Sequence, residues 1–245
     1  MRRPAARLLF LIIAFSCGSA ADAQPPSDRL RLSLLLTSDF KYNGLSQSAS
    51  DPAARLALDY EHPSGFFAGG FVSTVEYAAE SNFPNPRDSL VDVYAGYQWR
   101  RPGWSGSAFV SQYIYPGSTL DYDFIQATGS FSVRNRYFFE VSSSDEYMGI
   151  YGRSYLVRGG FSFPVRWGLD IGMNAGRFDA SGRFEANYDF WDVGLSRVVS
   201  RFALDLRYHA NGYDRTALYG GGEGDDFVFS VAYAITPPNR NPARR

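Results

Sequence analysis

The chain has 245 residues, a formal net charge of −1, 17% aromatic residues and 24 glycines. This length fits one large domain, and the absence of a basic excess argues against nucleic acid as a partner. The mean hydropathy of −0.25 resembles that of a soluble protein. A transmembrane β-barrel reaches a similar average, because its strands alternate lipid-facing apolar residues with polar residues of the lumen.

The first 23 residues have the features of a secretory signal peptide. Three arginines within the first seven residues precede an apolar run at residues 8–15, which is too short to span a bilayer. Ala21 and Ala23 form an A-x-A cleavage site. We therefore expect residues 1–23 to be a signal peptide that is cleaved near Ala23 after export.

The only cysteine, Cys17, lies inside this predicted signal peptide. Lipidation of Cys17 is the alternative, but a lipidation signal usually has leucine three residues earlier, where this chain has Ala14. Without the signal peptide the mature chain has no cysteine, which excludes disulfides, thiolate catalysis and cysteine zinc sites.

Residues 29–48 introduce a pattern that recurs along the mature chain. Leucine occupies every second position from Leu30 to Leu36, with Arg31 and Ser33 between, so a β-strand there has one aliphatic and one mostly polar face. We find no later apolar run of the roughly 20 residues that a transmembrane helix needs. The residues expected to face outward from the later strands are Leu56, Leu58, Tyr60; Phe67, Phe71, Val75, Tyr77; Val91, Val93, Ala95, Tyr97, Trp99; Tyr137, Phe139, Val141; Tyr155, Val157, Phe161, Phe163; Leu169, Ile171, Met173; Trp191, Val193, Leu195; Phe202, Leu204, Leu206, Tyr208; and Phe227, Phe229, Val231, Tyr233, Ile235.

Two segments in the middle of the chain, near residues 104–115 and 121–132, alternate less clearly. For the first of them two outward-facing sets are open: either Phe109, Tyr113 and Tyr115, or Ala108, Val110 and Ile114. Including both segments, we count about twelve strands, most of them near the ~9–11 residues of a tilted membrane strand.

The connections between these strands alternate strictly between long polar segments and very short ones. The long ones are residues 41–53, 78–88, 144–153, 179–187 and 210–224, and the short ones are 62–65, 100–103, 133–136, 164–166 and 199–200; residues 116–120 are short for their class. Such alternation places all long loops on one side of a sheet of hairpins, as in bacterial outer-membrane barrels.

The sequence thus predicts an all-β protein, a closed antiparallel up-and-down transmembrane β-barrel of about twelve strands over residues 24–235. Both ends of the barrel would lie on the short-turn side, in the periplasm, with aromatic residues near the short turns at the membrane interface. A soluble β-sandwich is the alternative. Residues 236–245 are rich in Pro and Arg and are predicted to be a disordered tail.

The first loop carries the most specific resemblance to a known family. Residues 37–40 and 44–48, followed by Asp51 and Pro52, look like the "SDYRFRGISQS…DPA" opening of the TorF-type family of proteobacterial porins. Three further motifs agree with that family: residues 65–69 with "GFYAG", 92–97 with "DLYAGY" and 115–117 with "YPG". Lys41 and Asn43 stand where the family usually has arginine. The resemblance implies a Gram-negative outer-membrane β-barrel with a porin function, but no particular substrate.

The charged residues predict the wall of the lumen, because an Arg or Lys facing lipid at mid-bilayer costs about 2–4 kcal/mol. The expected pore-lining residues are Arg31, Asp39, Arg55, Asp59, Glu61, Glu76, Asp92, Glu140, Arg158, Asp170, Asp192, Asp205, Arg207 and His209. Acids outnumber arginines in this set, so we predict a narrow, water-filled pore with a mild preference for cations. The alternative is that these charges pair across the lumen and plug it.

An enzymatic site is not expected. Of the two histidines, His62 lies in a predicted short turn, and His209 is separated from Asp205 by four strand residues, or roughly 13 Å, too far for a catalytic dyad. Acids in residues 220–226 lack the ligand spacing of an EF-hand, although they could bind divalent ions that bridge lipopolysaccharide. We therefore expect no cofactor and no metal site. The predicted partners are outer-membrane lipid and lipopolysaccharide, the barrel-assembly machinery, and small solutes or ions.

Overall fold

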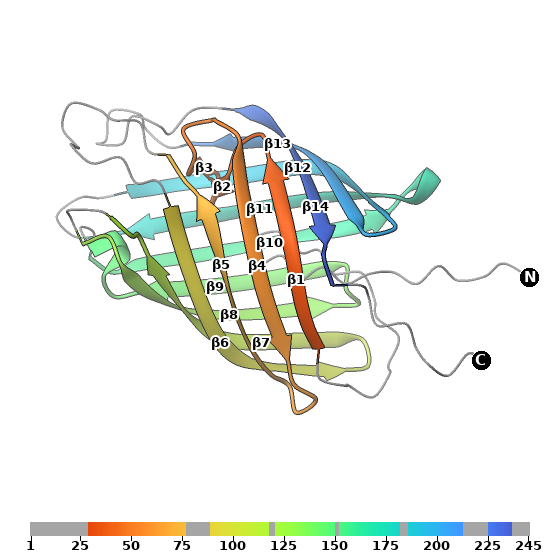
Figure 1. Cartoon of the computed structure of the whole chain (residues 1–245), viewed down its shortest axis with the longest axis horizontal. Helices are drawn as coiled ribbons and strands as arrows, with labels where there is room; N and C mark the ends of the chain where they lie inside the picture. Colours follow the sequence, from red (N-terminus) through yellow and green to blue (C-terminus); the bar gives the residue numbers. More distant parts are fainter. Residues whose placement is uncertain are drawn as a thin grey trace, which may run out of the picture.

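The computed structural model describes residues 29–76, 89–117, 121–149, 152–181, 186–212 and 225–236. Twelve strands form one closed antiparallel barrel (Figure 1), which confirms the predicted fold class and strand number. The barrel strands are β1 (Arg29–Thr37), β4 (Ala53–Glu61), β5 (Phe66–Thr74), β6 (Ser89–Arg101), β7 (Trp104–Ile114), β8 (Phe124–Val133), β9 (Tyr137–Ser144), β10 (Ser154–Pro164), β11 (Leu169–Ala180), β12 (Ala186–Val199), β13 (Phe202–Asn211) and β14 (Asp226–Ala234).

Three smaller elements lie in the connections. A two-stranded sheet, β2 (Lys41–Tyr42) with β3 (Leu45–Ser46), belongs to the first long loop, and two short 3-10 helices are η1 (Tyr147–Gly149) and η2 (Arg166–Gly168). None of the helices in the described parts of the chain has the length and hydrophobicity of a transmembrane helix.

Each barrel strand pairs with its neighbours in the chain, and β1 closes the ring by pairing with β14 from Ser33–Ala234 to Thr37–Ser230. Closure leaves no unpaired strand edge in the barrel wall. In Figure 1 the short turns lie along the right and lower edges of the barrel, β2 and β3 of the first long loop lie toward the opposite, upper end, and β1 begins and β14 ends at the short-turn end. The predicted signal peptide and tail lie outside the described residues.

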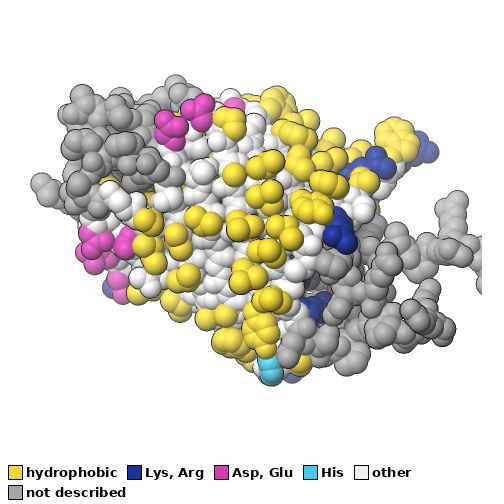
Figure 2. All heavy atoms as spheres, in the orientation of Figure 1, with side chains coloured by type: hydrophobic (Ala, Val, Ile, Leu, Met, Phe, Trp, Pro, Cys, Tyr) yellow, Lys and Arg dark blue, Asp and Glu magenta, His cyan; other side chains and the backbone are white. Residues whose placement is uncertain are grey.

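The outer surface of the barrel carries many large hydrophobic side chains, whose exposure to water would be unfavourable. They include Leu30, Leu58, Val93, Ile125, Phe139, Leu206, Phe227 and Phe229. Figure 2 shows hydrophobic side chains spread over the middle of one face, with acidic residues toward the long-loop end and basic residues toward the other. A contiguous apolar belt of this kind matches the hydrocarbon core of a bilayer.

The predicted orientation of β5 is wrong. Phe67, Phe71 and Val75 lie inside the barrel with 4–9% of their surface exposed, whereas Val72 on the same strand is 45% exposed. Alternation could not orient this strand, because its two faces are about equally apolar: aromatic residues occupy both phases, and small residues occupy its centre. Glu76, which follows β5, is consequently exposed and does not line the lumen.

The orientation of β7, which the sequence left open, is decided by the structure. Val110 is 51% exposed on the outside, and Tyr113 and Tyr115 are each 6% exposed inside. The set Ala108, Val110 and Ile114 therefore faces outward.

The interior of the barrel has two different halves. In the long-loop half, aromatic and aliphatic side chains pack into one buried cluster, the luminal aromatic cluster: Phe40, Phe71, Val75, Leu90, Tyr113, Tyr115, Tyr122, Phe124, Tyr147, Met148, Leu156, Phe178, Tyr188 and Phe190, with three alanines. In the short-turn half, the inward residues Ser107, Ser130 and Ser162 on β7, β8 and β10 are small, polar and only half-buried, whereas Phe67 and Tyr94 on β5 and β6 are buried. The lumen is thus packed toward the long loops and less completely filled toward the short turns.

The outward orientation of β7 can be tested with a charge. We predict that Val110→Arg, near the middle of this strand, destabilises the barrel in liposomes by about 2–4 kcal/mol, because it places a cation in hydrocarbon. Equilibrium unfolding in denaturant measures this loss, with Val110→Leu as the control expected to leave stability unchanged. A Val110→Arg variant as stable as the native chain would contradict the orientation.

Candidate functional site: the luminal hairpin and its cavity

The first long loop folds into the barrel as the luminal hairpin, which we define as residues 38–52. Its two strands are joined by Asn43 and Gly44, which have φ values of 50° and 81°. Positive φ at both central residues is the type I′ turn that Asn-Gly favours in two-residue hairpins. A Cβ on Gly44 would also lie 2.6 Å from Cβ of Phe190 on β12, so only glycine fits here. This local sequence therefore forms a tight hairpin that packs against the barrel wall.

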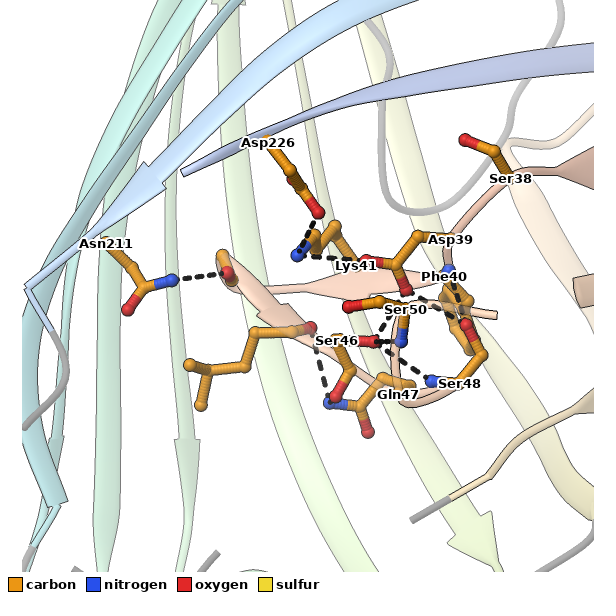
Figure 3. A network of polar contacts seen from close by, with 12 residues as sticks. Ser38, Asp39, Phe40, Lys41, Ser46, Gln47, Ser48, Ser50, Asn211 and Asp226 are labelled. Atoms are coloured by element: carbon orange, nitrogen blue, oxygen red, sulfur yellow. Dashed lines mark hydrogen bonds and ion pairs between the residues drawn. The ribbon is translucent and has the colours of Figure 1, made fainter. Parts of the chain in front are cut away.

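A carboxylate holds the two sides of the luminal hairpin together (Figure 3). One oxygen of Asp39 accepts hydrogen bonds from the hydroxyls of Ser46, at 2.6 Å, and Ser48, at 2.9 Å. The backbone N–H of Phe40 donates to the Ser48 hydroxyl, and that of Gln47 donates to the Phe40 carbonyl. These bonds give a structural role to the residues that resemble the family opening.

Lys41 anchors the luminal hairpin to the barrel wall. Its ammonium group, 1% exposed, lies 2.9 Å from Asp39 and 3.0 Å from Asp226 at the start of β14 (Figure 3). Asn211 at the end of β13 donates to the Gly44 carbonyl, and the backbone N–H of Glu76 donates to the Gln47 carbonyl. The hairpin is thus fixed to three parts of the chain that are distant in sequence.

Beneath the luminal hairpin lies a cavity, the luminal cavity, with a volume of about 40 Å³. That is room for only a few waters at about 10–15 Å³ each. Its lining comes from the hairpin and from β4 to β10: Phe40, Tyr42, Asn43, Gln47, Arg55, Phe71, Leu90, Asp92, Phe109, Tyr113, Tyr115, Gln126, Thr128, Glu140, Leu156 and Arg158. The hairpin and these side chains therefore leave little open space at this level of the lumen.

Aromatic contacts position the polar groups of the cavity. The Arg55 guanidinium lies between the rings of Phe40 and Phe71, 4.3 and 4.4 Å from their centroids. The Tyr42 hydroxyl lies 3.2 Å from that of Tyr113 and 3.1 Å from the side-chain oxygen of Gln126. Burial raises the pKa of the Tyr42 phenol to about 12, so the phenol is protonated and donates at neutral pH.

The other sequence-predicted lumen residues form ion pairs or hydrogen bonds on the inner wall. Arg158 lies 2.8 Å from Glu140 on the neighbouring strand. Arg207 contacts both Asp192 and Asp205. Toward the short turns, Arg31 contacts Glu61, and the Tyr94 hydroxyl donates to Asp59. Asp170 is half-buried near the same end, and His209 is buried with 4% exposure.

The two remaining acids predicted from the sequence to line the lumen, Asp92 and Asp39, are buried, with 0% and 4% of their surface exposed. Of the fourteen residues predicted from the sequence to line the pore, only Glu76 lies outside. Sequence reasoning missed Lys41, Tyr42, Tyr113 and Gln126, which the structure brings to the same level of the lumen. The Asn-Gly pair was an available signal for a hairpin, but no local pattern indicates that this hairpin turns inward.

The histidines and the acids in residues 220–226 were the candidates for catalytic or metal chemistry in the sequence. Among the described residues, no three His, Cys, Asp or Glu side chains are grouped so that they could hold a metal ion. His62 lies in the short turn between β4 and β5 and contacts the Ser64 hydroxyl through Nδ1 at 2.8 Å. Of the predicted acidic loop, residues 220–224 lie outside the described residues, while Asp226 points inward to Lys41.

Residues 21–235 match a bacterial sequence family described as "Bacterial protein of unknown function (Gcw_chp)". The chain belongs to this family. No curated protein matches the sequence significantly. The more specific resemblance to TorF-type porins stays a prediction.

Solved structures with a similar fold include porins and channels. The KdgM porin has a TM-score of 0.54 and 10% sequence identity, and the alignment covers 85% of this chain and 100% of that one. The NanC porin has a TM-score of 0.52 and 10% identity over the same shares. An outer-membrane channel from Pseudomonas putida F1 has a TM-score of 0.50 and 11% identity, covering 86% of this chain and 96% of that channel. At identities of 10–11%, the similarity shows that this chain shares the barrel fold of these porins and channels, and it shows the fold alone.

The Lys41 anchor can be tested because the predicted mature chain has no cysteine. We predict that Lys41→Met loosens the luminal hairpin, since removing one partner of a buried ion pair leaves Asp39 uncompensated at a cost of about 3–5 kcal/mol. A cysteine at Asn43 reports this: its reaction with a membrane-impermeant maleimide should be slow in the native background and at least about tenfold faster with Lys41→Met. Equal rates in both backgrounds would contradict the anchor, and Lys41→Arg is the charge-conserving control.

The packing of Arg55 can be tested separately. We predict that Phe40→Ala destabilises the barrel by about 3–5 kcal/mol, because it removes a buried aromatic side chain. Phe40→Leu should cost less, since it keeps apolar volume and loses mainly the cation–π contact, which is worth about 2 kcal/mol when desolvated. Equilibrium unfolding measures both. A Phe40→Leu variant as unstable as Phe40→Ala would show that the aromatic ring itself, and not apolar volume, provides the stability.

Proposed function

We propose that this protein is an outer-membrane channel for passive diffusion of small solutes or ions, and that the luminal hairpin limits the width of its pathway. The observation that carries the proposal is the buried hairpin inside a closed barrel with an apolar exterior and with charged residues on its inner wall. Porins and channels with the same fold support this function, and so does the resemblance to TorF-type porins.

The cellular setting follows from the same proposal. The signal peptide is cleaved near Ala23, the barrel-assembly machinery inserts the chain into the outer membrane of a Gram-negative bacterium, and the apolar belt contacts lipid and lipopolysaccharide. The short-turn end, where β1 begins, faces the periplasm. The described long connections face the outside.

We also propose a mild preference for cations. Four luminal cations, Arg31, Lys41, Arg158 and Arg207, are already in ion pairs. Asp59, Asp92 and Asp170 have no ion pair among the described residues, and Arg55 is one luminal cation that has none there either, so the lumen keeps an excess of negative charge. Carboxylates in a low-dielectric wall lower the energy of a passing cation.

A plugged barrel without transport is the second candidate. The luminal aromatic cluster favours it, because it fills the long-loop half of the interior with buried side chains. In that case the barrel would have a structural or surface-binding role.

Conductance separates the two candidates. We predict that the refolded mature chain in a planar bilayer gives small, cation-selective steps, and that replacing residues 41–46 by a short Gly-Ser link enlarges them several-fold, since the constriction is removed. Replacement of the short turn at residues 62–65 is the control and should leave conductance unchanged.

Other outcomes of this experiment are also decisive. A silent native chain with a conducting hairpin variant would establish the plugged barrel. Silence of both, with insertion verified, would contradict a channel, and an anion-favouring reversal potential would contradict the cation preference.

A further inference from the structure

The luminal cavity contains buried polar groups that have no partner. The Asp92 carboxylate is 0% exposed, and neither of its oxygens has a hydrogen-bond partner among the described residues. The Ser111 hydroxyl and the Arg55 guanidinium are the groups that act on this carboxylate, and the Ser111 hydroxyl has no other partner among the described residues. A buried carboxylate without partners is costly. A native protein retains such a group where it has a use, for example in binding a ligand.

The luminal hairpin contributes a second unpartnered group to the same cavity. Both amide atoms of Asn43, which is 6% exposed, have no hydrogen-bond partner among the described residues. Arg55 adds Nε, which is also without a partner there; the faces of its guanidinium are covered by Phe40 and Phe71, so only its edge is available. The cavity therefore offers both acceptors and donors from the hairpin and from the wall.

The charged side chains that line the cavity have no net charge. They are two arginines, Arg55 and Arg158, and two acids, Asp92 and Glu140. An anionic ligand would therefore be repelled by two carboxylates, and a cationic ligand by two guanidinium groups. The walls between these charges are aromatic, from Phe71, Phe109 and Tyr113. A ligand that fits has no net charge, presents hydroxyl groups that both donate and accept, and has C–H surfaces that pack on aromatic rings.

The cavity is reached from the short-turn half of the barrel. The luminal aromatic cluster closes it toward the long loops. At the other side, the side chains of Glu140 and Arg158 are 15% and 19% exposed, and half-buried serines continue from them toward the short turns. Since Asp92 is not exposed, a ligand hydroxyl reaches it only when the luminal hairpin shifts.

We infer that the luminal cavity is a binding site for a small neutral polyhydroxylated solute of the size of glycerol, because the cavity has room for only a few waters. Its hydroxyl groups donate to Asp92 and bond to the amide of Asn43. The inference deepens the proposed channel function and rests on it for its biological meaning, because it names the class of solute that the pathway would take.

The experiment measures binding to the refolded mature chain in a detergent without a sugar headgroup. Saturation-transfer NMR and titration follow glycerol and erythritol as neutral probes, with glycerate and 3-amino-1,2-propanediol as anionic and cationic probes of similar size. The variants are Asp92→Asn and Asn43→Ala, and the control is Asp170→Asn, a luminal carboxylate outside the cavity.

We expect the neutral probes to bind the native chain more tightly than either charged probe. Asp92→Asn should weaken their binding by about tenfold or more, since it removes hydrogen bonds to a charged acceptor, and Asp170→Asn should leave it unchanged. Binding should also change the maleimide reactivity of a cysteine introduced at Ser46, because the luminal hairpin shifts.

Three results would overturn the inference: no binding of glycerol or erythritol, tighter binding of glycerate or 3-amino-1,2-propanediol, or equal binding by the native chain and Asp92→Asn with both folded. Binding in detergent and conductance in a bilayer are independent readouts. A chain that binds glycerol but never conducts would refute the channel and keep the site, whereas one that conducts without binding would do the reverse.

Discussion

Closure of the barrel is the constraint on which the other features depend. In hydrocarbon every backbone N–H and C=O must be bonded within the protein, and the pairing of β1 with β14 satisfies the last two strand edges. A closed ring has an inside and an outside, so each strand must place one set of alternate residues in lipid and the other in the lumen. Leu58 and Asp59, adjacent on β4, meet these opposite demands: the leucine is 47% exposed and the aspartate is buried.

Charges that closure confines to the interior must find partners there. Neighbouring strands provide them for Arg158 with Glu140 and for Arg207 with Asp192, while the luminal hairpin brings Lys41 to Asp226. Such pairs add little net stability compared with apolar packing, but the loss of one partner is costly. They therefore fix the position of the hairpin more than they strengthen the barrel.

The same hairpin connects the fold to the proposed function. It narrows the lumen at the level where the interior changes from small polar residues to packed aromatic residues, and it completes the cavity around Asp92. Buried polar groups that lack full hydrogen bonding, such as those of Asp92 and Asn43, make this closed arrangement less stable than a fully bonded one. A solute that supplies the missing hydrogen bonds would relieve this cost, which links the width of the passage to what occupies it.

Alternation and loop length in the sequence determined the closed twelve-stranded barrel and the inward side of most charges, because a period of two is a local property of the chain. These two signals gave the wrong orientation for β5, because both of its faces are apolar. They left the orientation of β7 undecided, because neither of its faces carries a charge that would be unfavourable in lipid. The inward fold of the luminal hairpin, and with it the roles of Lys41, Tyr42 and Gln126, was decided only by the tertiary structure. Asn-Gly specifies a tight turn, but its direction depends on Asp226, Asn211 and Phe190, which lie more than a hundred residues away and meet the hairpin only when the barrel closes.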